Sequence, residues 1–531
     1  MDGCSDGERN LITHCLALIG PTHELSARER VVAEQARNAH AVHDAFVDDL
    51  RERVRAGEDP LGDEFLRVRC SLQRRLTGAI YTPQPVVRSM TTWLSQQGEI
   101  SRVVDPGAGS GRFILAAGRA FPKAQLIAIE PDPVAALMLR ANVCAHGWLS
   151  RTAILSTDYR NVELAPSDGA TAFVGNPPYL RHHHIEPKWK AWYASAFGRF
   201  GIRASALAGL HLHFLLKTCL IATRGDVGTL ITPAEWLDVN YGSALRQLFA
   251  GQLGGIGLHV LEPAVAAFPG TATTAAIVCF RIGEVDAPVR VRSVPSVEGL
   301  DGLARGALIE RVRLRTQEKW SPVVRPAKDE CPTGTELGEL FRVHRGQVTG
   351  ANQIWIAGAQ AQELPDRVKL AAVTKAVDLF KAGSQLDDPA SLRRVIDLPV
   401  ELDQLCDDER ARIHAFLAWA RARGAHSSYI ARHRKAWWSV GLRSPAPILC
   451  TYMARRAPQF TLNTCGARHI NVAHGLYPRA PISVQALTRL VSWLNRHVDT
   501  GSGRTYAGGL TKFEPREIER LRVPDLEASD P

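Results

Sequence analysis

The segment that follows the short apolar run over residues 171–175 reads Asn176-Pro177-Pro178-Tyr179. Two prolines fix the backbone φ angles and remove two N–H donors, so rigid carbonyl groups point outward. The side-chain carbonyl of Asn176 and the backbone carbonyl of Pro177 can together accept both hydrogens of an exocyclic amine. The nitrogen lone pair would then face an incoming methyl group, and the ring of Tyr179 offers a stacking surface for a planar base. These four residues therefore predict methyl transfer to an amino group.

A glycine-rich turn lies upstream and reads Asp105-Pro106-Gly107-Ala108-Gly109-Ser110-Gly111. It comes directly after an apolar run and opens a helix-length segment. Glycines let the backbone approach a cofactor closely, and a helix N-terminus favours carboxylate or other negative groups. We therefore predict that Asp105, Gly107 and Gly109 bind a cofactor.

Two further acidic residues follow apolar runs. Glu130 ends the run over 125–130, where a carboxylate can accept hydrogen bonds from both ribose hydroxyls of a nucleoside cofactor. Asp158 follows the run over 152–156, where it could accept a hydrogen bond from an adenine amino group. A nicotinamide cofactor and S-adenosylmethionine fit these acids equally well. The amine acceptors at Asn176 and Pro177 favour S-adenosylmethionine, because a dehydrogenase has no use for them.

The elements that must position these residues alternate in type. Helix-length segments separate short apolar runs, which is the pattern of βαβ units and a mainly parallel, doubly wound sheet. Ligands on such sheets bind beyond the carboxyl ends of the strands, where all the candidate residues lie. The predicted strands cover 102–105, 125–130, 152–156, 171–175, 226–232, 256–261 and 274–281, and the predicted helices 111–120, 132–146, 205–222 and 240–250.

Length and charge divide the chain further. Its 531 residues are enough for two to four domains, and we place an N-terminal helical segment at 1–75, a catalytic domain at 76–325 and a third region at 326–531. The formal net charge is +10. Residues 410–522 hold 19 Lys or Arg against four acids, a local balance of +15, whereas residues 380–409 are acid-rich. This balance favours a polyanionic partner for the third region.

Several classes of protein are excluded or disfavoured. No apolar stretch is long enough for a transmembrane helix, and the N-terminus lacks the pattern of a signal peptide. The ten cysteines show no CxxC spacing, so we expect reduced thiols in a cytoplasmic protein. Three consecutive histidines, 182–184, cannot all face one ion, and no metal site is expected there. They are better placed for contact with a phosphate.

Five motifs in this order resemble one known family, the gamma-class DNA adenine-N6 methyltransferases of restriction–modification systems. They are GAIYTP (78–83), DPGAGSG (105–111), IEPD (129–132), TDY (157–159) and NPPY (176–179). The resemblance implies a Rossmann-like, class I S-adenosylmethionine-dependent methyltransferase core with a mainly parallel seven-stranded sheet. It also implies an α+β target-recognition domain at the C-terminus. Tyr81 and Thr82 match the residues that contact the methionine part of the cofactor, and Ala108 replaces the family's usual cysteine.

By the same resemblance, Phe268 would stack on an extruded adenine opposite Tyr179. Extruding a base costs a few kcal/mol, and stacking on an aromatic ring returns about 1–3 kcal/mol. In the C-terminal region the matching segments are 345–352, 437–443, 451–456, 469–478 and 508–524. The residues we select there for DNA contact are Arg345, Thr349, Asn352, Arg455, Arg456 and Lys512.

The activity implied is transfer of a methyl group from S-adenosylmethionine to N6 of a flipped-out adenine in duplex DNA. Such an enzyme would act as a monomer, beside a separate restriction endonuclease, since residues 1–75 are too few for a nuclease domain. Two alternatives remain open at this point. One is methylation of an RNA base or of a protein glutamine, although the basic C-terminal region is unlike glutamine-modifying relatives. The other is a DNA-binding subunit with a decayed cofactor site, which the intact Asp105, Glu130 and Asn176 disfavour.

Overall fold

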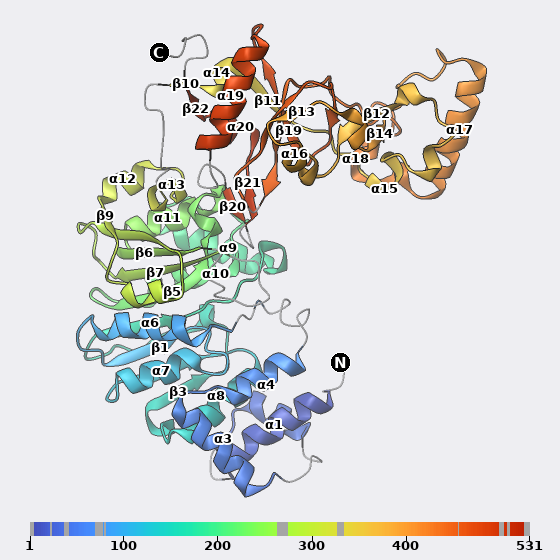
Figure 1. Ribbon diagram of the computed structural model, residues 1–531. Coiled ribbons are helices and arrows are strands. Elements are labelled where there is room, and N and C mark those ends of the chain that lie inside the picture. Colours follow the sequence, from blue (N-terminus) through green and yellow to red (C-terminus); the bar gives the residue numbers. More distant parts are fainter. Residues whose placement is uncertain are drawn as a thin grey trace. The chain divides into compact units, whose positions relative to one another are not determined.

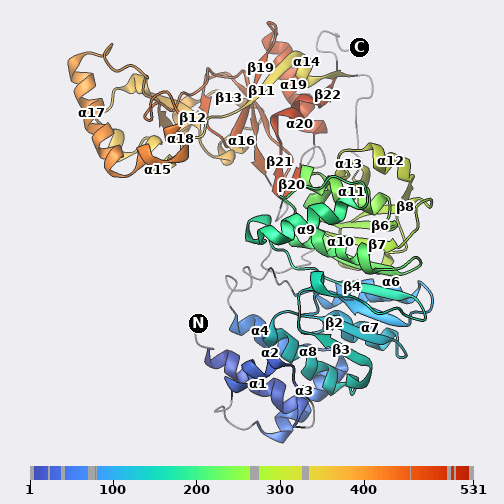
Figure 2. The same cartoon turned by 180° about the vertical axis from the view of Figure 1, so that it is seen from behind.

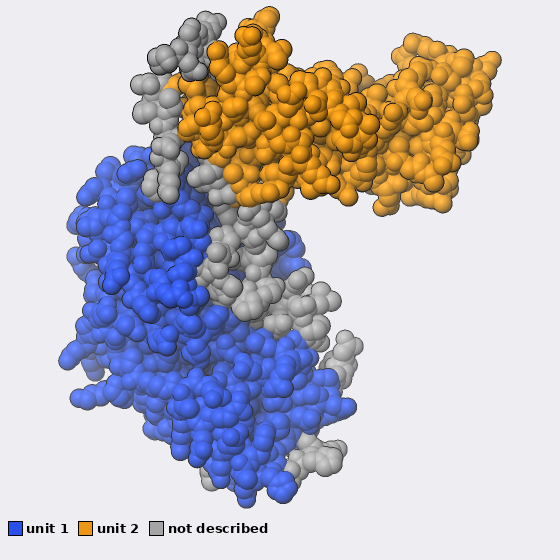
Figure 3. All heavy atoms as spheres, in the orientation of Figure 1, with its two compact units in different colours: residues 1–325, 507–509 blue, residues 326–506, 510–531 orange. Residues whose placement is uncertain are grey.

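The computed structural model describes residues 5–21, 24–36, 42–69, 78, 81–262, 274–325, 334–454, 456–498, 504–506 and 510–524. The chain divides into two compact units, coloured separately in Figure 3. Unit 1 comprises Met1–Arg325 with Ala507–Gly509, and unit 2 comprises Pro326–Tyr506 with Leu510–Pro531. Within the described residues, no helix is both long and apolar enough to span a membrane.

Unit 1 is built on a nine-stranded sheet with the order β3-β2-β1-β4-β5-β7-β6-β8-β9. The first five strands in this order run parallel, and β7 runs antiparallel to its neighbours β5 and β6. This is the mainly parallel, Rossmann-like sheet that the sequence predicts. The strands are β1 (Arg102–Asp105), β2 (Gln125–Ile129), β3 (Thr152–Leu155), β4 (Thr171–Gly175), β5 (Val227–Pro233), β6 (Gly255–Leu261), β7 (Ala275–Arg281), β8 (Val289–Val294) and β9 (Ala307–Ile309).

The expected count of seven strands is wrong: the sheet has nine, because β8 and β9 extend it. β8 pairs in parallel with β6, and β9 pairs antiparallel with β8. The sequence of β8, VRVRSV, buries Val289, Val291 and Val294 while its arginines are exposed or half-buried. Such alternation suits a strand near the edge of a sheet with one face in the core.

Helices cover both faces of this sheet (Figures 1 and 2). Neighbouring residues of one strand, such as Val103 and Val104, point into two different apolar clusters. One cluster joins the sheet to α6 and α7, and the other joins it to α9, α10 and α11. The helices are α6 (Gln84–Ser95), α7 (Arg112–Ala120), α8 (Pro133–Ala145), α9 (Pro187–Gly198), α10 (Leu210–Ile221), α11 (Ser243–Ala250), α12 (Arg311–Thr316) and α13 (Ser321–Val324).

The N-terminal segment of unit 1 is helical and packs against α8. Its buried residues Leu11, Leu50 and Leu61 share one apolar cluster with Leu137 and Met138 of α8. The segment therefore covers a helix of the catalytic fold and is not a separate domain. Its helices are α1 (Asp6–Ile19), α2 (Ala27–Glu34), α3 (Asp44–Ala56) and α4 (Pro60–Val68).

The described residues of unit 2 form four apolar clusters, and the two largest each join a helix to a sheet. In the first, α19 packs Leu487, Leu490 and Leu494 against a five-stranded sheet with the order β11-β19-β15-β17-β13. In the second, α17 packs Phe416 and Leu417 beside a three-stranded sheet, β14-β12-β18. The mixture of sheets and helices confirms the α+β class predicted for this region.

The elements of unit 2 are short. The strands are β10 (Thr335–Glu336), β11 (Phe341–Arg345), β12 (Lys369–Val373), β13 (Gln385–Leu386), β14 (Arg394–Ile396), β15 (Ile448–Thr451), β16 (Met453–Ala454), β17 (Phe460–Asn463), β18 (Arg468–His469), β19 (Ala473–Pro478), β20 (Arg504–Tyr506), β21 (Leu510–Lys512) and β22 (Arg522–Val523). The helices are α14 (Leu337–Leu340), α15 (Asn352–Trp355), α16 (Ala376–Ala382), α17 (Asp407–Ala422), α18 (Tyr429–Arg432), α19 (Val484–His497) and α20 (Pro515–Glu519).

Candidate active site

The predicted site residues lie along one edge of the unit 1 sheet. Asp105 ends β1, Glu130 directly follows β2, and Asn176 directly follows β4. These strands are parallel neighbours, so their carboxyl ends meet at the same edge. Residues 71 positions apart in the sequence are thereby brought to one place.

Asp105 approaches the backbone before Asn176 very closely. A Cβ atom at Gly175 would lie 2.7 Å from Oδ1 of Asp105, so a residue without a side chain is needed there. The N–H of Gly107 donates to the same oxygen at 3.3 Å. The other oxygen, Oδ2, is buried and has no hydrogen-bond partner among the described residues. Burial raises the pKa of Asp105 to about 8, against the Gly107 hydrogen bond and with the charge of Glu130 adding to the shift.

Glu130 faces the glycine-rich turn. Its carboxylate accepts hydrogen bonds from the N–H groups of Gly109 and Asp132, both at 2.8 Å. Gly109 has a φ of +55°, which favours glycine at this position of the turn. Burial raises the pKa of Glu130 to about 7. Two carboxyl groups with raised pKa values therefore border the turn.

These raised pKa values predict a pH-dependent stability. Between the ordinary carboxyl pKa of about 4 and about 8, these two groups bind more protons in the folded protein than in the unfolded chain, so their contribution to the free energy of unfolding falls as the pH rises. We expect Asp105→Asn to reduce this fall, because one of the two titrating groups is removed. The check is urea denaturation between pH 5 and pH 8, with Asp168→Asn, an exposed carboxylate, as control. An unchanged slope for Asp105→Asn would contradict the raised pKa.

The loop after β4 is tied to the segment around Thr82. The side-chain N–H of Asn176 donates to the hydroxyl of Thr82 at 3.0 Å, and the backbone N–H of Tyr179 donates to the carbonyl of Gly78 at 2.9 Å. A Cβ atom at Gly107 would lie 3.8 Å from the backbone carbonyl oxygen of Asn176. Three motifs predicted from separate parts of the sequence are therefore in contact.

Tyr179 packs beside a neutral imidazole. Its ring meets the ring of His211 edge-on, with centroids 6.1 Å apart. His211 is buried, and burial lowers its pKa to about 3, so the imidazole carries no charge at neutral pH. Burial also raises the pKa of the Tyr179 hydroxyl. A neutral aromatic surface beside Asn176 suits the stacking of a planar base.

Asp158 is already paired within the chain. Arg160 donates from Nε at 2.9 Å and from Nη2 at 2.6 Å to its two carboxylate oxygens, and its guanidinium lies 4.0 Å from the ring centroid of Trp189. Burial alone would raise the pKa of Asp158, but the hydrogen bonds and charge of Arg160 outweigh it and lower the pKa. That Asp158 accepts a hydrogen bond from an adenine amino group stays a prediction. The sequence reasoning missed Arg160, although it lies only two residues away.

Comparison with known proteins places both units in one family. Residues 59–200 match the N-6 DNA methylase family, residues 153–253 the Eco57I restriction-modification methylase family, and residues 327–531 the C-terminal domain of the type II methyltransferase M.Eco57I. The type II methyltransferase M.XamI of Xanthomonas campestris pv. amaranthicola is 60% identical over 528 residues, covering 98% of each chain. This chain belongs to the type II methyltransferases of restriction–modification systems.

More distant relatives agree with this membership. The type II methyltransferase M.AccI of Acinetobacter calcoaceticus is 20% identical over 85% of this methyltransferase and 86% of its own chain. Among solved structures, the type IIL restriction-modification enzyme MmeI in complex with DNA aligns with 98% of this chain and 79% of its own, at a TM-score of 0.56 and 13% identity. The type IIG restriction endonuclease BpuSI aligns with 100% of this chain and 72% of its own, at a TM-score of 0.50 and 15% identity. These structures share the fold of the methyltransferase.

The residues predicted to contact DNA lie in unit 2 of the methyltransferase. The guanidinium of Arg345 and the ammonium of Lys512 lie 4.3 Å and 5.2 Å from the ring centroid of Tyr452. The guanidinium of Arg456 lies 3.5 Å from the ring centroid of Phe380. Thr349 donates a hydrogen bond from its hydroxyl to the side chain of Asn352. Their contacts with DNA stay predictions.

Two predicted site residues, Phe268 and Arg455, lie outside the described residues. Stacking of an adenine on Phe268 therefore stays a prediction.

Gly78 supports the NPPY loop of the methyltransferase through its backbone. It has a φ of +71°, and a Cβ atom there would lie 2.9 Å from the backbone nitrogens of Tyr179 and Leu180. We expect Gly78→Ala to lower kcat by about 10- to 100-fold, because the loop must shift by a fraction of an ångström or more. Gly147→Ala is the matched control, since Gly147 has a φ of +70° and open space around it. Equal kcat values in the two variants would show that the close contact has no role.

Proposed function

We propose that this methyltransferase transfers a methyl group from S-adenosylmethionine to N6 of an adenine in DNA, as the modification enzyme of a restriction–modification system. The observation that carries the proposal is that three motifs meet at one edge of the sheet. Asn176 contacts Thr82 and lies beside Gly107, and the preceding Gly175 lies against Asp105. It occurs in a chain that matches the N-6 DNA methylase family and is 60% identical to a type II methyltransferase.

The residues at this edge fit S-adenosylmethionine. Asp105 and Glu130 supply two carboxyl groups beside the turn, and Glu130 would accept hydrogen bonds from the ribose hydroxyls of the cofactor. The buried Oδ2 of Asp105 has no hydrogen-bond partner among the described residues, and the open space at Gly109, where a Cβ atom would meet nothing within 4 Å, leaves room for close approach of a ligand to the backbone. Tyr81 and Thr82 would hold the methionine part. When bound, the cofactor supplies an electrophilic methyl group.

The residues of this chain then orient the acceptor amine. The side-chain oxygen of Asn176 and the backbone oxygen of Pro177 accept its two hydrogens, while Pro178 keeps the loop rigid. The lone pair points away from these oxygens, and the same oxygens stabilise the positive charge that develops on nitrogen during direct transfer. The base, extruded from the duplex, stacks on Tyr179 and Phe268. A proton leaves the amine after transfer, and no covalent intermediate forms with the protein.

Duplex DNA is the substrate that the whole chain favours. The tRNA1(Val) (adenine(37)-N6)-methyltransferase of Shewanella amazonensis is 32% identical over 133 residues, which is 25% of this chain and 53% of its own. That likeness covers only a quarter of this chain, so it keeps an RNA base as the second candidate. Unit 2 instead matches the C-terminal domain of a type II methyltransferase. A monomeric state, a separate restriction endonuclease and a cytoplasmic location stay predictions.

The test uses purified protein, methyl-labelled S-adenosylmethionine and either unmethylated genomic DNA or structured RNA, with the nucleosides analysed by mass spectrometry. Label in N6-methyl-deoxyadenosine would establish the reaction, base and cofactor together. Label on N4 of deoxycytidine would keep the mechanism but correct the base. Label only in RNA would overturn DNA as the substrate.

A further inference from the structure

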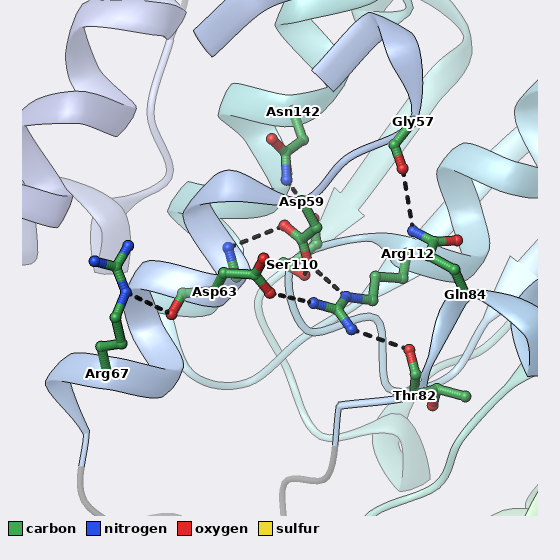
Figure 4. A network of polar contacts seen from close by, with 10 residues as sticks. Gly57, Asp59, Asp63, Arg67, Thr82, Gln84, Ser110, Arg112 and Asn142 are labelled. Carbon is green, nitrogen blue, oxygen red and sulfur yellow. Dashed lines mark hydrogen bonds and ion pairs between the residues drawn. The ribbon is translucent and has the colours of Figure 1, made fainter. Parts of the chain in front are cut away.

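Arg112 connects three segments that are distant in the sequence. It is the first residue of α7, directly after the glycine-rich turn, and its side chain is 15% exposed. Each of its guanidinium nitrogens donates to a different acceptor (Figure 4). Nε donates to Asp59 Oδ2 at 2.6 Å, Nη1 to the carbonyl of Thr82 at 3.1 Å, and Nη2 to Asp63 Oδ1 at 2.9 Å.

Asp59 anchors this arrangement in the N-terminal helices. It caps α4 by accepting the N–H of Gly62 at 2.9 Å, and its side chain is 5% exposed. Its Oδ2 also accepts the hydroxyl of Ser110 at 2.6 Å, while Asn142 donates to the Ser110 carbonyl at 2.8 Å. Asp59 therefore holds both the glycine-rich turn and Arg112.

Thr82 connects Arg112 to the NPPY loop. Its carbonyl accepts from Arg112, its hydroxyl accepts from the side-chain N–H of Asn176, and the residue is 3% exposed. The neighbouring ring of Tyr81 lies 5.2 Å below the Arg112 guanidinium. A continuous series of contacts therefore runs from Asp59 through Arg112 and Thr82 to Asn176.

We propose that Asp59 and Arg112 are positioning residues for methyl transfer: they hold Thr82 so that its hydroxyl fixes the amide plane of Asn176. The inference rests on the proposed function, in which Asn176 accepts the hydrogens of the target amine. It gives α4 a part in catalysis, beyond the packing of the N-terminal helices on α8.

The geometry explains why an arginine occupies position 112. The three acceptors are bonded by three separate guanidinium nitrogens, whereas the three donors of a lysine ammonium all sit on one flexible nitrogen and lack this fixed, planar spacing. Displacement of a reacting group by about 1 Å can lower a rate by about 100-fold. Loss of the Arg112–Thr82 contact should therefore change turnover more than cofactor binding, because Arg112 contacts the predicted cofactor-binding residues only at the backbone carbonyl of Thr82 and the ring of Tyr81, as far as the described residues show.

The first measurement follows the side-chain amide signals of Asn176 by NMR, in unliganded protein labelled with ¹⁵N-asparagine. The signals are assigned by their loss in Asn176→Ala. We expect them to shift in Thr82→Val and Arg112→Met, and to stay in place in Thr82→Ser, which keeps the hydroxyl. Arg67→Met is the control, because Arg67 is an exposed arginine of α4 whose Nε donates to the Asp63 carbonyl at 3.4 Å, with no hydrogen bond to Thr82 or Asn176 among the described residues. Unshifted signals in Arg112→Met would overturn the proposal, whatever the substrate of the enzyme.

The second measurement separates kcat from KM with DNA as substrate. We expect Arg112→Met to lower kcat at least 10-fold, with cofactor affinity by calorimetry changed less than threefold. Adding Arg112→Met to Thr82→Val should lower kcat little further, since both act through Asn176. If the losses of kcat in Arg112→Met and Thr82→Val instead multiply in the double variant, the two residues act independently and the proposal is wrong. Shifted NMR signals together with an inactive wild-type protein would instead reject DNA methylation and leave the positioning role intact.

Discussion

Replacing Asn176 with alanine should abolish methyl transfer while binding of S-adenosylmethionine survives. The variant keeps the turn around Gly107 and Gly109, the carboxylates of Asp105 and Glu130, and the two prolines of the loop. It loses the side-chain oxygen that accepts one hydrogen of the target amine. Removing one such preorganised group typically costs about 100- to 1,000-fold in kcat, and we expect at least that loss here.

The measurement pairs two assays on the same protein preparation. Single-turnover transfer of labelled methyl groups to genomic DNA reports the chemical step, and calorimetry reports cofactor affinity. Asn240→Ala is the control, because Asn240 is an exposed asparagine elsewhere in unit 1 and should leave both values unchanged. Turnover near the wild-type rate in Asn176→Ala would mean that the NPPY loop does not orient the amine.

Much of the unit 1 sheet could be predicted from the sequence, because its central strands are short apolar runs bounded by glycine, proline or charged residues. β1 and β4 begin and end at the predicted residues, and β5 is displaced by one residue. β8 was missed, since its alternating valines and arginines do not show which sheet it joins. Strand pairing depends on distant residues, and a single sequence carries no record of the partner.

The candidate site shows a similar division. The motifs around Thr82, Gly107 and Asn176 were found because each carries a distinctive local pattern. Asp59 was not recognised as a site residue, because an Asp-Pro pair before an apolar helix predicts only a helix N-cap. Its ion pair with Arg112 joins residues 53 positions apart. Such pairs follow from how the helices pack, and neither residue alone differs from an ordinary surface charge in the sequence.

The Glu29→Ala substitution should cause a large loss of stability, although Glu29 lies far from the glycine-rich turn in the sequence. Glu29 lies on α2 and is 0% exposed. Its carboxylate accepts two hydrogen bonds from Arg140 of α8, both at 2.9 Å, and a third from the backbone N–H of Ser26 at 2.6 Å. Removing one partner of a buried ion pair leaves the other charge uncompensated, which costs about 3–5 kcal/mol. Urea denaturation of unit 1 measures this loss, with the exposed Glu24→Ala as control.

The double variant Glu29→Leu with Arg140→Leu tests whether the uncompensated charge of Arg140 causes the loss of stability. Replacing both charges with apolar side chains removes the unpaired charge, so most of the lost stability should return. Equal unfolding free energies for Glu29→Ala and Glu24→Ala would show that the pair contributes nothing. Below its melting temperature, Glu29→Ala should keep a normal kcat, because among the described residues Glu29 and its partner Arg140 make no hydrogen bond to Asp59, Arg112 or Thr82. A loss of kcat in Arg112→Met but not in Glu29→Ala would therefore separate the two roles of the N-terminal helices: α2 stabilises α8, and α4 positions the catalytic loop.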